Sequence, residues 1–380
     1  MKNRANINWG RTAVLLTPYL VTIAWADAGL SEAIDNIFAD IDADSEPGCA
    51  AGVIHNGEYI HKAGYGLANL EYGIPITSQS VFRTGSVGKQ FTAMAIAILA
   101  ERGELELDAD VHEYLPDLMD YGHEVTIRQM VHHIAGMGDY DNEAFRNSDG
   151  TEFRFGNEDF WTIEEFYRKV TQADLNHEPG SEYEYSNLAY FLLSRVVESV
   201  SGESLRKFAA KEMFGRLGMS DTLFNDNVNQ PVRNRADGYR LMDDGGWEIF
   251  MTNLSWVGDG GVYTNLDDFL KWDQNFYDNK LGKGGNSLIS MVTTPHPDTI
   301  EYTDEGPRNV NYAFGQRVDE LNGEYAVTHT GGWVAFSTIY TRYPELGLSV
   351  VVFCNSTETS GPELGTKVGE IAVAAIKQQK

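Results

Sequence analysis

A serine and a lysine three positions apart are the residues of this sequence best suited to chemistry. Ser86 and Lys89 stand at the start of a helix-favouring run, and this spacing brings two side chains onto one helix face. A serine hydroxyl is a weak nucleophile until a neighbour accepts its proton. A lysine accepts that proton when burial or a second cation keeps it neutral, and a helix N-terminus favours negative charge on the serine. The spacing therefore predicts Ser86 as a nucleophile and Lys89 as its base.

The spacing alone does not decide the assignment, because Ser204 and Lys207 repeat it. Ser204 follows Gly202 and precedes a helix-favouring run that contains Phe208. Serine is one of the residues that most often cap a helix N-terminus. We therefore expect Ser204 to be a helix cap and not a nucleophile.

The tripeptide Tyr185-Ser186-Asn187 is the second candidate for a chemical role. A tyrosine near a lysine can have its pKa lowered and act as a base, and an asparagine amide can hydrogen-bond a substrate amide. The same pattern recurs at residues 263–265, so it is not specific alone. Tyr185, however, follows a Pro-Gly loop at 179–180 and precedes an apolar helical run. We predict that Tyr185 transfers protons and that Asn187 binds substrate.

The third candidate is His329-Thr330-Gly331-Gly332. These residues are expected to end a strand that covers 325–328. The two glycines would let a substrate backbone approach, and a strand edge offers N–H donors to it. This stretch predicts a substrate-binding edge near the C-terminus.

Strands and helices at both ends of the chain must position these residues. Asn56-Gly57 is a strong hairpin signal, and Pro-Glu-Leu-Gly at 344–347 joins two further apolar runs. Helical spacing of apolar residues marks the two terminal segments and five segments in the middle of the chain. The predicted strands are 49–55, 58–63, 338–342 and 348–353; the predicted helices are 30–41, 87–102, 126–134, 163–172, 187–200, 204–216 and 363–377.

This order of elements predicts an α+β fold. An antiparallel β-sheet flanked by N- and C-terminal helices would be interrupted by a large, mostly helical insert. We place the sheet domain at residues 29–82 and 250–380 and the helical domain at 83–249.

As one ordered set, these elements resemble the serine β-lactamase and penicillin-binding superfamily. The matching branch contains class C β-lactamases, transpeptidase-type DD-peptidases, D-aminopeptidases and related esterases. Its Ser-x-x-Lys, Tyr-Ser-Asn and His-Thr-Gly elements correspond to Ser86–Lys89, Tyr185–Asn187 and His329–Gly331. Supporting stretches include Phe-Arg-Thr-Gly before Ser86 and Gly-Gly-Val at 260–262. The resemblance covers nearly the whole chain after its first residues.

The resemblance implies acyl-enzyme chemistry without a cofactor or a metal ion. Ser86 would attack a carbonyl while Lys89 and Tyr185 share the proton transfers, and either of the two could be the base. The backbone N–H groups of Ser86 and Gly332 would form the oxyanion hole. Substrate binding would fall to Asn187, His329, Thr330, Gly331 and Gly332. The substrate, a small molecule or peptide, stays open between a D-peptide, a β-lactam and an ester.

The chain departs from the superfamily pattern at His329 and in the stretch 130–136. Many relatives have lysine where this chain has His329, and a histidine titrates near ~6.5. Affinity for an anionic substrate is therefore expected to fall as the pH rises through that region. The common Leu-Leu-x-His-Thr-Ser-Gly stretch appears here as Met-Val-His-His-Ile-Ala-Gly at 130–136, and we interpret its two histidines, His132 and His133, as structural. For an ester, three aromatic residues could line an acyl pocket: Trp256, Trp333 and Phe336.

The chain contains two cysteines, Cys49 and Cys354. In the superfamily the first strand runs antiparallel beside the last, so the resemblance implies that these residues could form a disulfide. Two buried free thiols are the alternative.

The N-terminus and the charge bear on location and partners. Residues 1–28 have the basic start, short apolar run and small-residue cleavage site of a signal peptide, which predicts a periplasmic or secreted protein without a membrane span after cleavage. The net charge of −27 argues against nucleic-acid binding. The alternative to an enzyme is a non-catalytic sensor or binding protein on the same fold.

Overall fold

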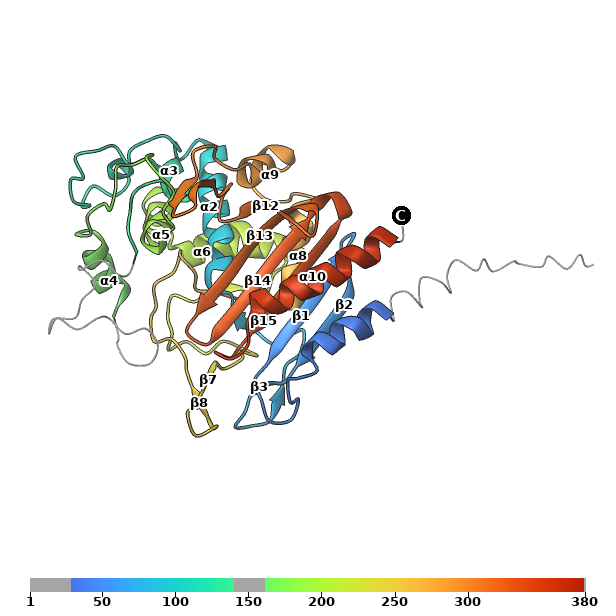
Figure 1. Ribbon diagram of the computed structural model, residues 1–380. Coiled ribbons are helices and arrows are strands. Elements are labelled where there is room, and N and C mark those ends of the chain that lie inside the picture. Colours follow the sequence, from blue (N-terminus) through green and yellow to red (C-terminus); the bar gives the residue numbers. More distant parts are fainter. Residues whose placement is uncertain (1–28, 140–160, 379–380) are drawn as a thin grey trace, which may run out of the picture.

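A six-stranded antiparallel sheet is the centre of the computed structural model, which describes residues 29–139 and 161–378 (Figure 1). The strand order is β12-β13-β14-β15-β1-β2, so the first and last strands of the sequence are neighbours in its middle. The strands are β1 (Cys49–His55), β2 (Glu58–Tyr65), β12 (Arg317–Leu321), β13 (Glu324–Trp333), β14 (Phe336–Tyr343) and β15 (Leu348–Cys354).

The two hairpins expected from the sequence are present. Asn56 and Gly57 have φ values of 51° and 82°, which is the left-handed conformation that a two-residue turn between strands requires. Every residue of β15 and all but the last of β1 are buried, in agreement with their nearly continuous apolar sequences. Cys49 and Cys354 lie opposite each other in this central pair and form a disulfide, so the free-thiol alternative does not hold.

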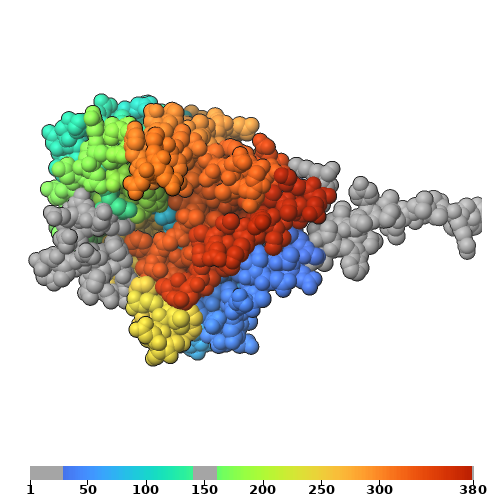
Figure 2. Space-filling view, viewed as in Figure 1, coloured from blue at the N-terminus to red at the C-terminus, as the bar shows by residue number. Residues whose placement is uncertain are grey.

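Both terminal helices cover one face of the sheet. The helical segment 29–35 continues into η1 (Asn36–Phe38). Helix α10 (Gly361–Gln378) packs against strands β14 and β15. Apolar side chains of both segments share one core cluster with alternate residues of β1 and β15. Figure 2 shows the N-terminal segment (blue) and α10 (red) side by side on this surface. The terminal helices thus pack as the helical spacing predicted.

The opposite face of the sheet packs against a helical layer. Helix α2 (Lys89–Arg102) is its central element, because all its residues from Lys89 to Leu99 are buried. The other α-helices are α3 (Ile127–Val131), α4 (Ile163–Val170), α5 (Asn187–Ser201), α6 (Leu205–Ala209), α7 (Gly215–Leu217), α8 (Leu266–Asn275) and α9 (Asn286–Thr293). None of the helices in the described parts of the chain combines the length and apolar character needed to cross a membrane.

Short strands connect the two layers. The sheet β5-β9-β6 matters most, because it places residue 83 beside residue 263 and so brings the start of α2 next to the Gly-Asp-Gly-Gly segment at 258–261. The short strands are β3 (Leu67–Asn69), β4 (Ile74–Pro75), β5 (Phe82–Arg83), β6 (Leu223–Phe224), β7 (Tyr239–Leu241), β8 (Trp247–Ile249), β9 (Val262–Thr264), β10 (Ile300–Thr303) and β11 (Gly306–Asn309).

The α+β class and the helical insert are confirmed, and three local expectations are corrected. Ser86 lies in the 3₁₀ turn η2 (Gly85–Gly88) just before α2, not in the α-helix. His329 does not end a strand, because β13 continues to Trp333 through its pairing with β14. Segment 204–216 is interrupted by a π-helical turn at Ala210–Phe214. The domain boundaries stay a prediction, and the expected leader 1–28 lies outside the described residues.

Candidate active site

Lys89 lies at the centre of the site and fixes the position of Ser86. Its side chain is fully buried, and Nζ is 3.4 Å from Ser86 Oγ. The ammonium also donates to Asn187 Oδ1 at 2.6 Å and to the backbone oxygen of Asp259 at 2.6 Å. Three acceptors from three chain segments therefore hold Nζ, and the i to i+3 geometry predicted from the sequence survives in the 3₁₀ turn.

Two glycines bring β13 against the turn that carries Ser86. A Cβ on Gly331 would lie 2.1 Å from the Thr84 carbonyl oxygen, and one on Gly85 would lie 2.8 Å from the Gly332 nitrogen. Gly85 also has a φ of 52°, which a residue with a side chain rarely adopts. Gly331 thus allows close packing against Thr84 and lines neither cavity at Ser86, and its role in substrate binding stays a prediction. The same approach places Gly332 next to Ser86.

Tyr185 and Asn187 are positioned by the start of α5. The Ser186 hydroxyl accepts a hydrogen bond from the Ala189 backbone and caps this helix. His133 accepts the Ser186 backbone N–H through Nδ1 at 3.0 Å, and its ring packs 4.4 Å from the Tyr185 ring centroid. His133 therefore has a structural role, as predicted, because it helps to hold Tyr185 in place.

Burial sets the protonation of Lys89 and Tyr185 in opposite directions. Burial lowers the pKa of Lys89 to about 8, although the carboxylates of Asp259 and Asp139 oppose the shift. Burial also raises the pKa of Tyr185 well above 10, and a hydrogen bond with Ser86 only partly offsets it. The expectation of a lowered tyrosine pKa is therefore wrong: the Lys89 ammonium lies 4.8 Å from the centroid of the Tyr185 ring, yet desolvation outweighs its charge.

His329 is a neutral hydrogen-bonding residue. Its Nδ1 is 2.6 Å from the Thr330 carbonyl oxygen, which can only accept, so Nδ1 carries the proton. Nε2 then accepts from the Tyr312 hydroxyl at 2.9 Å. Desolvation lowers the pKa of His329 to about 3, and the Lys89 and Arg317 charges add to the shift. The predicted loss of anion affinity through titration of His329 near neutral pH is therefore wrong.

Two cavities meet at Ser86 and Gly332, the residues that line both of them. The larger has a volume of about 370 Å³ and the smaller about 30 Å³. The larger cavity is lined by Ser86, Tyr183, Tyr185, Glu301, Tyr312, Arg317, Thr328, His329, Thr330 and Gly332. The smaller cavity is lined by Arg83, Gly85, Ser86, Asn187, Asp259, Gly260, Gly332 and Trp333. The predicted site residues thus come together, with Tyr185, His329 and Thr330 on one side and Asn187 on the other.

Arg317 is a site residue that the sequence reasoning missed. It lies on β12 opposite Thr328, half-buried in the wall of the larger cavity, beside the Tyr183 hydroxyl. The acid in the same wall, Glu301, forms an ion pair with Arg308. Among the described residues no carboxylate forms an ion pair with Arg317. Only the β12–β13 register brings this arginine near Ser86, and no local sequence signal identifies it.

Two carboxylates were missed as well. Asp139 accepts a hydrogen bond from Asn187 Nδ2 at 2.8 Å, so both ends of the Asn187 amide are engaged. Asp259 is 4% exposed and lines the smaller cavity. The sequence does not distinguish Asp259 from the aspartate of an ordinary glycine-rich turn, because its burial follows from the packing of segment 258–261 against η2.

The predicted aromatic acyl pocket is only partly present. Trp333 lines the smaller cavity, but Trp256 and Phe336 are buried and line neither cavity at Ser86. Trp256 stacks on Phe166 with ring centroids 3.7 Å apart. The larger cavity is therefore walled by phenol, imidazole and guanidinium groups and not by apolar side chains.

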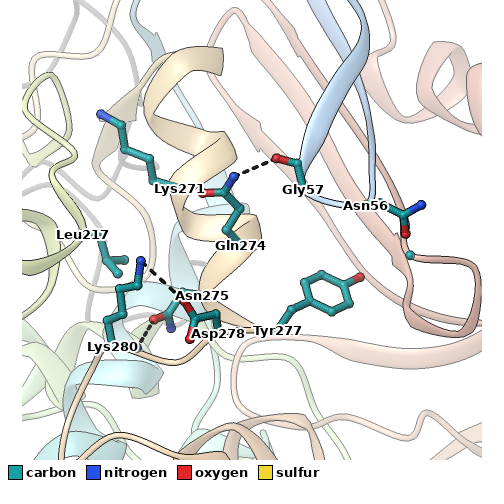
Figure 3. A pocket seen from close by; sticks show the side chains of 10 residues that line it. Asn56, Gly57, Leu217, Lys271, Gln274, Asn275, Tyr277, Asp278 and Lys280 are labelled. Carbon is teal, nitrogen blue, oxygen red and sulfur yellow. Dashed lines mark hydrogen bonds and ion pairs between the residues drawn. The ribbon is translucent and has the colours of Figure 1, made fainter.

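Another cavity, of about 540 Å³, shares no lining residue with the two at Ser86 (Figure 3). Its polar groups are already engaged: Gln274 donates to the Gly57 carbonyl at 2.7 Å, and Lys280 pairs with Asp278. In residues 29–139 and 161–378, no group of three or more histidine, cysteine or acidic side chains is arranged to hold a metal ion.

Comparison with known proteins gives matches along most of the chain. The family model described as Beta-lactamase matches residues 34–373. A D-aminopeptidase of Gluconobacter oxydans (strain 621H) is 28% identical over 309 residues, which cover 81% of this chain and 56% of the relative. Penicillin-binding protein 4* of Bacillus subtilis (strain 168) is 26% identical over 320 residues, covering 80% and 66%. The chain thus spans between about half and two thirds of the length of these curated relatives.

Solved structures share the fold. The octameric penicillin-binding protein homologue from Pyrococcus abyssi superposes with a TM-score of 0.74 at 23% identity, covering 93% of this chain and 77% of its own. The D-amino acid amidase from Ochrobactrum anthropi SV3 gives a TM-score of 0.70 at 20% identity, covering 92% and 99%. The architecture is therefore common to proteins with different substrates, and the site must supply the argument about chemistry.

Proposed function

Because the chain belongs to the Beta-lactamase family, we propose that it is a serine hydrolase that forms an acyl-enzyme on Ser86 with substrates carrying a carboxylate. The observation that carries the proposal is Arg317, a guanidinium in the wall of the Ser86 cavity that pairs with no described carboxylate. Arginine binds carboxylates through two parallel hydrogen bonds. A D-peptide with a free C-terminus and a β-lactam both offer such a group, whereas a simple ester does not.

In the first step Ser86 Oγ attacks the substrate carbonyl and Lys89 takes its proton. Lys89 suits this role because burial lowers its pKa to about 8, close to the operating pH. The backbone N–H groups of Ser86 and Gly332 stabilise the oxyanion, since both residues stand where the two cavities meet. Tyr185, whose raised pKa keeps it protonated, passes a proton to the leaving group. In this scheme Lys89 is the base and Tyr185 the acid, whereas the sequence left open which of the two is the base.

The larger cavity accepts the leaving group and its carboxylate. A volume of about 370 Å³ suits the end of a small peptide. Arg317 supplies a positive charge in this cavity, whereas His329 is neutral. The exposed residue Thr330, which lines the same cavity, offers a hydroxyl. The names of the relatives, D-aminopeptidase and penicillin-binding protein, agree with substrates of this class.

Purified protein should be assayed against a D-Ala-D-Ala peptide, a chromogenic cephalosporin and a short-chain p-nitrophenyl ester. We expect Arg317→Gln to lower kcat/KM for the two carboxylate substrates roughly 10- to 100-fold, because a hydrogen bond to a charged group contributes about 1.5–3 kcal/mol. The ester should be affected little. Arg240→Gln, on β7, is the control, since Arg240 pairs with Glu248 and neither residue lines a cavity at Ser86. Equal losses for all three substrates would remove Arg317 from carboxylate binding.

We also propose that the protein acts in the periplasm or outside the cell. The leader-like sequence of residues 1–28 and the disulfide between Cys49 and Cys354 support an oxidising compartment. Expression of the full chain in a bacterium, followed by the intact mass of the extracytoplasmic protein, tests this. Retention of residues 1–26 in a cytoplasmic product would contradict the proposal.

A further inference from the structure

We propose that the smaller cavity beside Ser86 holds the water that releases the acyl group, and that Asp259 is the base that activates this water. The inference rests on the proposed function, because only an acyl-enzyme needs a hydrolytic water. It assigns a role to a carboxylate that the acylation step leaves unused.

The cavity has the size and position that a hydrolytic water requires. Its volume of about 30 Å³ accommodates one or two water molecules, since a single water needs roughly 10–15 Å³. Ser86 and Gly332 line it as well as the larger cavity, so an acyl carbonyl in the oxyanion hole would stand at the junction. Water can therefore approach that carbonyl from the side opposite to the leaving group.

Among the described residues that line this cavity, Asp259 is the one acid. Its backbone is held from both sides. The carbonyl oxygen of Asp259 accepts from Lys89 Nζ at 2.6 Å, and a Cβ on the adjacent Gly260 would lie 3.1 Å from the Gly85 carbonyl oxygen. On the other flank Gly258 has a φ of 118°, and a Cβ there would lie 2.4 Å from the Tyr190 carbonyl oxygen. The glycines let the segment press against η2, which places the buried residue Asp259 in the wall of the cavity.

Neither Lys89 nor Tyr185 lines the smaller cavity, although both serve acylation. Tyr185 lines the larger cavity. Because burial raises its pKa, Tyr185 stays protonated and cannot accept a proton from the water. The other lining side chains with polar groups are Arg83, Ser86, Asn187 and Trp333. Arginine and tryptophan only donate, and the Asn187 amide is held by Lys89 and Asp139. Of the described side chains that line this cavity, Asp259 is therefore the one suited to act as a general base.

The step balances as follows in atoms and protons. When the leaving group departs, Tyr185 regains its proton from the Lys89 ammonium, so Lys89 is neutral in the acyl-enzyme. The water oxygen bonds to the acyl carbon while one water proton moves to the Asp259 carboxylate. The bond between the acyl carbon and Ser86 Oγ then breaks, and the proton on Asp259 passes through solvent and Lys89 to Oγ. The product leaves as a carboxylic acid. The enzyme regains its starting protonation and no further reactant is needed.

The test compares Asp259→Asn with Asp139→Asn in a pre-steady-state assay. The carboxylates of Asp259 and Asp139 both oppose the lowering of the Lys89 pKa, so both variants remove one negative charge near the lysine. Only Asp259 lines the cavity. With a p-nitrophenyl ester or a labelled penicillin, Asp259→Asn should keep a burst of one product per site and slow the following turnover ~10²–10⁴-fold, the usual contribution of a general base. Intact mass should show the acyl-enzyme accumulating.

At pH 9, above the pKa of Lys89 in both proteins, Asp139→Asn should leave the ratio of deacylation to acylation rates within about threefold of the unmodified enzyme. Equal slowing of both steps in the two variants would show that Asp259 acts only through charge on Lys89 and would overturn the inference. If Asp259→Asn fails to fold, Asp259→Glu keeps the charge but fills the water space. That variant should also accumulate acyl-enzyme, and normal deacylation by it would contradict the proposal. Absence of an acyl adduct on Ser86 in both the unmodified enzyme and Asp259→Asn would instead refute the proposed function.

Discussion

Replacement of Asp139 by asparagine should move the pH dependence of acylation toward lower pH. Lys89 must be neutral to accept the Ser86 proton, and burial places its pKa at about 8. The value of kcat/KM should therefore rise with pH and level off above that value. Asp139 reaches Lys89 through the Asn187 amide, by hydrogen bonds of 2.8 and 2.6 Å. Its carboxylate favours the charged lysine, so its removal lowers the lysine pKa.

The size of the shift follows from Coulomb's law. The intervening amide puts the two charges about 7 Å apart, and an effective dielectric constant of about 20–40 gives roughly 1–2 kcal/mol. Asp139 is half-buried, so solvent screening favours the lower end of this range, or about one pH unit. At pH 6 the variant should then show a roughly tenfold larger fraction of its own plateau activity than the unmodified enzyme.

The assay is kcat/KM for one ester from pH 5 to 9, normalised to each plateau. Asparagine keeps an oxygen acceptor for Asn187 Nδ2, so the change is mainly one of charge. Asp278→Asn is the control, because Asp278 lies in the cavity that shares no residue with the site (Figure 3). An unchanged or upward-shifted limb for Asp139→Asn would refute the assignment of Lys89 as the base.

Three further predictions test separate parts of the account. Ser86→Ala should abolish covalent labelling by a fluorophosphonate or a labelled penicillin, and persistent labelling would exclude Ser86 as the nucleophile. Affinity for a carboxylate substrate should stay constant between pH 5.5 and 8, because the lowered pKa of about 3 keeps His329 neutral there; a drop centred near pH 6.5 in inhibitor titrations would show a charged histidine. Paired replacement of Cys49 and Cys354 by alanine should lower the free energy of unfolding by about 2–5 kcal/mol in denaturant titrations, since the bridge spans 305 positions. An unchanged midpoint would mean that the disulfide contributes nothing to stability.

Local sequence signals predicted the elements whose structure depends on near neighbours. The Asn56-Gly57 turn, the cap at Ser204 and the helix α10 are all where the sequence put them. Each depends on a dihedral preference, one hydrogen bond or a short apolar repeat. The Ser86–Lys89 spacing belongs to the same class, because three positions in a 3₁₀ or α turn bring two side chains together.

Errors in the sequence reasoning fall where distant segments meet. The strand predicted to end at His329 is longer in the structure. Its pairing with β14, and not its own composition, sets where it ends. The close approach of Gly331 to the Thr84 carbonyl is likewise a contact between distant segments that the sequence does not predict. Arg317 carries no local signal, and its place beside Ser86 depends on the register of β12 against β13.

The sequence by itself determined the family, the fold class and the set of residues gathered around Ser86, because ordered motifs and apolar periodicity are properties of the chain. The tertiary structure decided what those residues do. Burial makes Lys89 the group that loses a proton near neutral pH, keeps Tyr185 protonated and keeps His329 neutral. Desolvation and the charges of remote segments set these proton affinities, and neither exists until the chain has folded.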